Sequence, residues 1–136
     1  MAINRQQVIA SENGRVLAWH FTSDSNDIDD PTNHYLDLEL VGPLSNDEWR
    51  RGVAIGIALP SGGSARVWLS MDHNLDTRYV LSASNGSATF TASEVVGQYL
   101  PFQSLRMAVD GASASNPVKL EILLPPSDFS RFRDIT

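Results

Sequence analysis

The stretch ARVWLSMDHNLDTRYVLSASNGSATFTA, residues 65–92, decides the fold, because turn residues divide it into three short runs with a strand-like pattern. In the first run Val67 and Leu69 alternate with Trp68, and successive side chains of a β-strand leave opposite faces of its sheet. Trp68 therefore lies on the face away from the core and is a candidate surface aromatic. The runs predict strands over residues 65–70, 78–82 and 88–91, with a tight hairpin at Asn85-Gly86 before the last.

The same period of two extends toward the N-terminus. In residues 15–21 one face carries three large apolar side chains that we expect in the core: Leu17, Trp19 and Phe21. In residues 34–41 three leucines share one face, whereas Asp37 and Glu39 share the other and are expected to be solvated. Each of these runs therefore predicts a strand with one buried face.

Further alternating runs predict strands over residues 8–11, 52–59, 103–109 and 118–124. Residues 45–51 favour one helical turn, and residues 92–99 fit either a short helical turn or an irregular crossover. Strands at this spacing are typical of sandwiches and barrels, and alternation disfavours a parallel sheet buried on both faces. The sequence thus predicts an all-β fold, an antiparallel β-sandwich of jelly-roll type with about eight strands.

The 136 residues fit one domain, which we place at residues 8–124 between an N-terminal arm, 1–7, and a C-terminal tail, 125–136. The tail alternates aromatic and cationic side chains, which are common hot spots of protein interfaces: Phe129, Arg131, Phe132 and Arg133. Trp49, Arg50 and Arg51 form a second expected contact patch. The alternative for the tail is that it packs on its own domain or frays.

Composition excludes several function classes. The formal net charge of -6 opposes binding to the phosphate backbone, so no nucleic-acid partner is expected. The chain contains no cysteine, which removes disulfides, thiolate metal sites and thiol nucleophiles. Residues 1–14 do not resemble a secretory signal, and no apolar run has the length of a membrane span, so no membrane partner is expected.

No motif of known catalytic chemistry occurs in the sequence. His20, His34 and His73 have no paired metal-ligand spacing, and no GxSxG elbow is present. The acidic loop 22–33 supplies oxygen ligands of the kind that calcium prefers, but it lacks the glycine and glutamate of the helix-loop-helix calcium site. We therefore expect no enzymatic activity, no cofactor and no metal, and leave calcium in this loop open against a solvated acidic loop.

Trp49, Trp68 and Tyr99 supply an alternative function. An aromatic face packs against the apolar face of a sugar ring, so these residues together predict a carbohydrate-binding module. The competing interpretation is that they pack in the core or at a sheet edge.

Three segments resemble the all-β structural proteins of tailed-phage virions: VWLSMDHNLDTRYVLSAS (67–84), YLPFQSLRMAVDG (99–111) and PVKLEILLP (117–125). The matching features are a Ser-x-Asp turn at Ser70-Met71-Asp72, Tyr79 in the next strand, and a Tyr-x-Pro-Phe-x-x-Leu-Arg strand from Tyr99 to Arg106. Leu75 stands where those proteins carry an aromatic residue after the turn, which argues against ligand binding by that loop.

The resemblance implies a non-enzymatic capsid decoration, or cement, protein that binds on or between coat subunits and stabilises the shell. Its implied partner is the major capsid protein or another virion protein, and its implied form is a homo-oligomer. The protein would be made in the host cytoplasm and located in the virion. A phage tail or baseplate component, which would form a closed ring, is the remaining alternative besides the carbohydrate-binding module.

Overall fold

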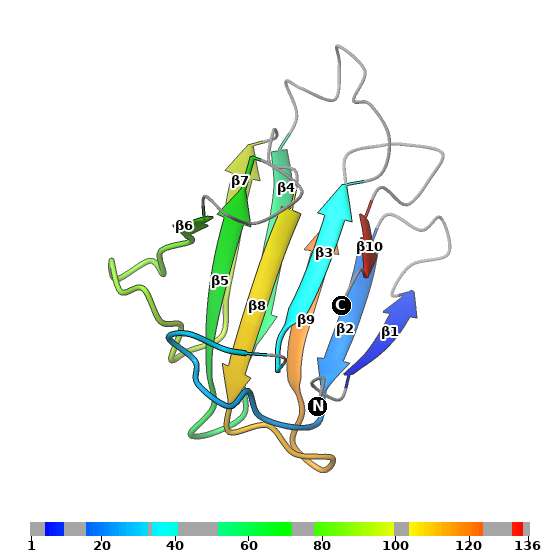
Figure 1. The fold of residues 1–136 in the computed structure, drawn as a ribbon, viewed down its shortest axis with the longest axis vertical. Coiled ribbons are helices and arrows are strands. Elements are labelled where there is room, and N and C mark those ends of the chain that lie inside the picture. Colours follow the sequence, from blue (N-terminus) through cyan, green and yellow to red (C-terminus); the bar gives the residue numbers. More distant parts are fainter. Residues whose placement is uncertain are drawn as a thin grey trace.

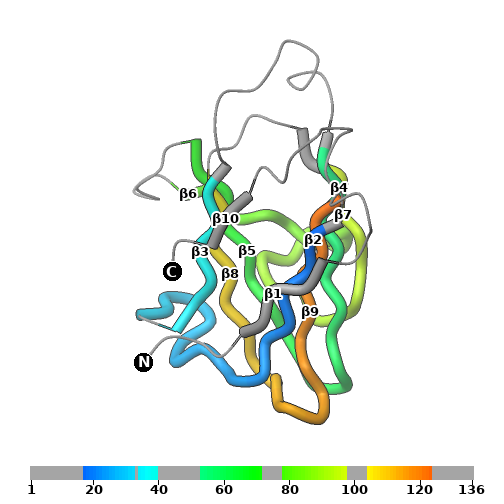
Figure 2. The backbone as a smooth tube through the Cα atoms, turned by 90° about the vertical axis from the view of Figure 1, so that its right-hand side faces the viewer, coloured from blue at the N-terminus to red at the C-terminus, as the bar shows by residue number. Residues whose placement is uncertain are grey.

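A computed structural model of the 136-residue chain describes residues 5–9, 16–32, 34–40, 52–71, 78–99, 104–123 and 132–134. These residues form two antiparallel β-sheets that face one another (Figures 1 and 2). Among them, no helix is long and apolar enough to cross a membrane. The expected all-β class and the two-sheet arrangement are therefore confirmed.

Ten strands lie in the described part of the chain: β1 (Arg5–Ile9), β2 (Val16–Phe21), β3 (Leu36–Leu40), β4 (Gly52–Ala58), β5 (Ser64–Ser70), β6 (Arg78–Val80), β7 (Glu94–Tyr99), β8 (Ser104–Asp110), β9 (Val118–Leu123) and β10 (Phe132–Asp134). We call the sheet with order β1-β2-β9-β4-β7 sheet A, and the sheet with order β10-β3-β8-β5-β6 sheet B. Sheet B lies toward the viewer in Figure 1.

The strand pairing is nested. β5 pairs with β6, β4 with β7, β3 with β8 and β2 with β9, each pair antiparallel. The chain is therefore folded like one long hairpin. Its successive strand pairs alternate between the two sheets, so that each sheet contains two of the four nested pairs. β1 and β10 extend the sheets outside this nest, where they pair with β2 and β3.

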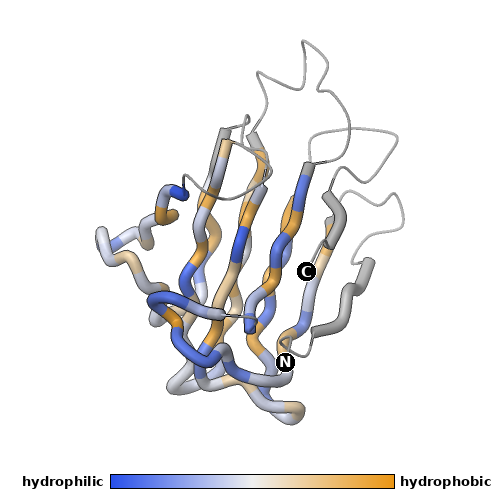
Figure 3. Tube along the Cα trace, in the orientation of Figure 1, coloured by the Kyte–Doolittle hydropathy of each residue, from blue (hydrophilic) through white to orange (hydrophobic). Residues whose placement is uncertain are grey.

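The core is a single apolar layer between the sheets. Hydrophobic and hydrophilic residues alternate along the strands (Figure 3), and most described side chains on the inner faces of both sheets are buried. The largest are Trp19, Phe21, Phe90, Leu17, Leu36, Leu38, Ile55, Leu105, Met107, Leu120 and Ile122. The expected core face of residues 15–21 is thus confirmed.

Two local predictions are wrong. Residues 94–99, expected as a helical turn or crossover, form strand β7. Its neighbouring residues Val95 and Val96 lie on opposite faces but are both apolar, so the sequence shows no alternation of apolar and polar residues. Residues 88–91, expected as a strand, make only an isolated bridge, in which Phe90 exchanges backbone hydrogen bonds of 2.8 and 3.0 Å with Ala65. The reason is topological, because β6 belongs to sheet B and β7 to sheet A, so this segment must cross between the sheets.

The expected turn at Asn85-Gly86 is present in another form. Gly86 has a φ of 84°, and its N–H donates a hydrogen bond to the carbonyl of Ala83. The N–H of Ala83 in turn donates to the carbonyl of Ser87. This pattern is a three-residue loop with glycine in the left-handed region. It therefore reverses the chain before the crossover rather than joining two ladder strands.

Both ends of the expected domain are exceeded. Residues 5–7, from the expected arm, pair with β2, and residues 132–134, from the expected tail, pair with β3. β1 and β10 lie on the same lateral side of the sandwich (Figures 1 and 2). The domain limits of 8–124 remain a prediction, and the expected helical turn at 45–51 lies outside the described residues.

Leu120 and Leu123 offer a matched test of the two faces of β9. Leu120→Ala lowers the free energy of unfolding by about 3 kcal/mol, because a buried side chain is removed and a cavity remains. Leu123 is 42% exposed, and Leu123→Ala costs less than about 1 kcal/mol. Urea unfolding followed by tryptophan fluorescence measures both values. Equal losses would contradict the assigned faces.

Candidate functional site

The outer face of sheet B carries an ion pair that includes Asp37, a carboxylate that we expected to be solvated. Asp37 is buried, and Arg106 donates to it from Nε to Oδ1 at 2.7 Å and from Nη2 to Oδ2 at 2.8 Å. The two residues are cross-strand partners on β3 and β8. The expectation of a solvated Asp37 is therefore wrong, because the cation that covers it comes from a strand 69 residues away.

Arg106 is also stacked on an aromatic ring. Its guanidinium lies 3.8 Å from the ring centroid of Tyr35, a distance at which a cation is attracted to the ring face. The hydrogen bond to Asp37 raises the pKa of Arg106 above its ordinary value, against the opposing effect of burial. The guanidinium thus stays charged through the neutral range and loses its own charge only in strong alkali.

The loop of residues 22–32 is fastened across one end of the same face (Figure 2). Ser25 exchanges hydrogen bonds of 2.8 and 3.0 Å with the backbone of Val109, and Asp24 accepts from the N–H of Ala112. Farther along, Asp29 forms a 2.6 Å ion pair with Arg66. The acidic loop therefore acts as a strap over sheet B, held by its own hydroxyl and carboxylate groups.

Trp68 is not a surface aromatic. It points to the outer face of sheet B, as the alternation predicts, but only 6% of the residue is exposed. Its cross-strand neighbours are Arg106 and Val80, and the guanidinium of Arg78 lies 5.5 Å from its ring centroid. The expected exposure of Trp68 is therefore wrong, whereas its role in partner or carbohydrate binding stays a prediction.

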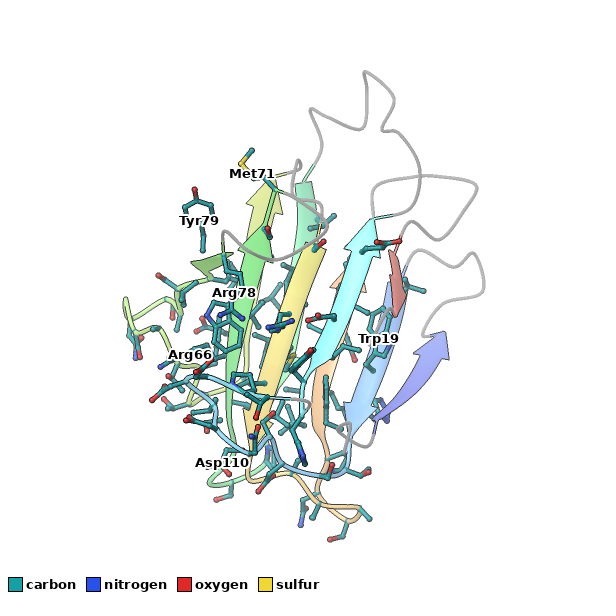
Figure 4. The ribbon with its side chains drawn as sticks, in the orientation of Figure 1. Trp19, Arg66, Met71, Arg78, Tyr79 and Asp110 are labelled. Carbon is teal, nitrogen blue, oxygen red and sulfur yellow. The ribbon has the colours of Figure 1, made fainter. Side chains whose placement is uncertain are left out.

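The exposed apolar groups of sheet B lie instead around the β5–β6 hairpin. Met71 is 69% exposed, Tyr79 60% and Val80 40%. Figure 4 shows Met71 and Tyr79 projecting from the upper end of the sandwich, with Arg78 nearby. We call Met71, Tyr79 and Val80 the hairpin patch. Sequence reasoning missed it because alternation assigns faces and does not show where a strand runs past the end of the opposing sheet.

The described residues do not assemble a metal site. No three of their histidine and acidic side chains gather closely enough to hold an ion. Within the acidic loop, Asp27 accepts from the backbone of Asp29, and Asp29 pairs with Arg66. These carboxylates thus serve the conformation of the loop.

Most of the expected contact residues fall outside the described residues: Trp49, Arg50, Arg51, Phe129 and Arg131. Phe132 and Arg133 belong to β10, where they pair with Leu40 and Glu39 of β3. His73 and the Ser-x-Asp turn beyond Met71 also lie outside, and Tyr99, the third member of the expected sugar platform, ends β7. Of the expected contact residues that the structure describes, Phe132 and Arg133 are separated from Trp68 by strands β3 and β8 of sheet B.

Comparison of the chain with protein-family models, with curated proteins and with solved structures finds no significant match. Its function is therefore inferred from the surfaces and contacts described above.

The buried ion pair predicts a large asymmetry between two aspartates. Asp37→Ala lowers the free energy of unfolding by about 3 kcal/mol, because the partly buried Arg106 guanidinium is left without its carboxylate partner. Asp29→Ala is the matched control, since this carboxylate is 69% exposed and its loss costs less than about 1 kcal/mol. Chemical denaturation measures both variants.

A double substitution separates the charge from the packing. Asp37→Leu together with Arg106→Met recovers most of the stability, because an apolar pair of similar volume leaves no buried charge. If Asp37→Ala costs no more than Asp29→Ala, the ion pair is not a buried one in solution.

Proposed function

We propose that this protein is a non-enzymatic capsid decoration protein of a tailed phage, which docks on coat subunits and stabilises the shell. The observation that carries the proposal is the hairpin patch at one end of a closed sandwich. Met71, Tyr79 and Val80 are all exposed at the β5–β6 hairpin, where Val80 and the cationic Arg78 lie on the face of β6 opposite to Tyr79. Aromatic, methionine and arginine side chains are enriched in protein interfaces and among their hot spots, so this end is suited to a protein partner.

The strand order supports a jelly-roll assignment within this proposal. The four nested pairs divide into β2-β9-β4-β7 in sheet A and β3-β8-β5-β6 in sheet B, an arrangement of eight strands in two sheets. Jelly rolls of this size build viral capsid and lectin domains. Fold alone does not determine function, so the assignment supports a virion protein only together with the exposed patch.

The chemistry of sheet B also favours adhesion over catalysis. Asp37 and Arg106 satisfy one another, and Arg66 binds Asp29 and Thr89. A general acid or base needs a proton that it can exchange with a substrate, whereas these groups hold the face together. The polar groups of this face thus serve to keep the docking surface rigid.

The proposal predicts that capsid binding depends on the hairpin patch. In Tyr79→Ser with Met71→Ser the affinity for expanded phage capsids falls about 30-fold, the effect of losing a hot spot worth about 2 kcal/mol. Leu123→Ser is the matched control, because Leu123 is also exposed and lies on sheet A. Bound copies per capsid, counted after sedimentation of mixtures over a range of protein concentrations, give the affinities.

Three other outcomes reject this assignment of the site. Absence of binding by the unaltered chain rejects the decoration role, and equal losses in the patch and control variants reject the patch. Quenching of tyrosine fluorescence by a panel of glycans, lost in Tyr79→Ser, would place the chain among carbohydrate-binding modules instead.

A further inference from the structure

The outer faces of the two sheets differ in what covers them. The strap of residues 22–32 crosses sheet B, whereas no described segment crosses the middle of the outer face of sheet A (Figure 2). On that face Val95 is 73% exposed and Leu123 is 42% exposed. Sheet A therefore presents an open surface on which apolar side chains remain in contact with water.

A shallow groove of about 300 Å³ runs across this surface. Its floor is the backbone of Gly56 with Ala58 on β4, and its walls are Val95 on β7 and Glu121 on β9. A Cβ atom added to Gly56 would meet no heavy atom closer than 3.7 Å. Packing within one chain thus does not require glycine at position 56. The groove is open because Gly56 has no side chain to fill it.

Charge and size alternate along the groove. On β9 Lys119 precedes Glu121 on the same face, and neither makes an ion pair or hydrogen bond with another described residue. Next to them on β4, Ala58 pairs with Lys119 and Gly56 pairs with Glu121. The row of cross-strand partners that contains Lys119 and Ala58 is therefore cationic. The next row, which contains Glu121 and Gly56, is anionic and carries the groove.

We propose that this face binds a second copy of the same chain in a two-fold symmetric dimer. The two-fold axis lies between sheet A of one copy and sheet A of the other, and it is perpendicular to the strands. It passes over Ile57 and Leu120, which are cross-strand partners. It places Lys119 of each copy over Glu121 of the other, and Ala58 over Gly56. Val95 of each copy then lies over the Ser93 end of β7 in the other, beside the groove that Ala58 enters, so that every contact occurs twice.

The order of charges selects a second copy with antiparallel strands. If the strands of the two faces ran parallel in register, lysine would face lysine and glutamate would face glutamate, which is repulsive. Sheets that pack face to face lie about 10 Å apart, a gap that a lysine and a glutamate can span. The groove and the charges therefore specify the same arrangement. This inference is independent of the proposed capsid role.

Charge exchange tests the proposal on the full-length chain. Sedimentation velocity at an ionic strength near 0.15 M, where the Debye length is about 8 Å, screens the repulsion between the net charges of two copies but not the contact pairs. The unaltered chain sediments as a dimer. Lys119→Glu and Glu121→Lys each weaken the dimer about tenfold or more, because like charges then meet across the axis.

Two further samples distinguish pairing from a general effect of charge. The double variant Lys119→Glu with Glu121→Lys restores the dimer to within about threefold of the original affinity, because opposite charges again face one another. An equimolar mixture of the two single variants forms a heterodimer, since one carries only glutamates and the other only lysines at these positions. Circular dichroism verifies that each variant folds.

A covalent readout needs no substitution. Lys119 is the only lysine of the chain, so a zero-length carbodiimide reagent that couples amines to carboxylates has one internal amine to act on. A cross-linked product of twice the chain mass, with Lys119 joined to Glu121 in the peptide map, is expected. Gly56→Leu, which fills the groove of the folded monomer, abolishes this product.

Sedimentation as a monomer at every concentration overturns the proposal. A dimer whose affinity does not respond to either charge variant, or which the double variant fails to restore, also overturns it. A cross-linked dimer joined only through the N-terminal amine does the same.

Discussion

The nested antiparallel pairing of the strands is the constraint on which the rest of the structure depends. Each strand must pair sideways within its own sheet and bury one face against the other, and strands from opposite ends of the chain become neighbours. β2 pairs with β9, for example, so that Trp19 lies beside Leu120. The core is therefore complete only when the long-range pairs have formed, a topology that is associated with slow folding.

The same pairing produces two outer faces with different chemistry. On sheet B it brings Asp37 to Arg106, and the strap then covers the charged groups around Arg66. On sheet A the neighbouring residues are small, and Gly56 leaves the groove open between two taller side chains. One face is thus closed by contacts within the chain, whereas no described segment covers the middle of the other.

Sequence patterning predicted most of the ladder strands because alternation is a local property. It could not predict β7, in which Val95 and Val96 are both apolar, or the three-residue β10, which is too short to show a period. The errors at Asp37 and Trp68 share one cause. Whether an outward side chain meets water depends on what crosses the face, and Arg106 and Arg78 come from elements distant in the chain or beyond a loop.

Strands β1 and β10 lie on one lateral side of the sandwich, outside the eight nested strands (Figure 1). The order of the chain therefore resembles a ring that has been opened at this side. A linker from β10 to β1, with the chain opened instead at an exposed turn such as Ser61-Gly62, would leave every nested pair intact. The order of the described strands is thus compatible with circular permutation.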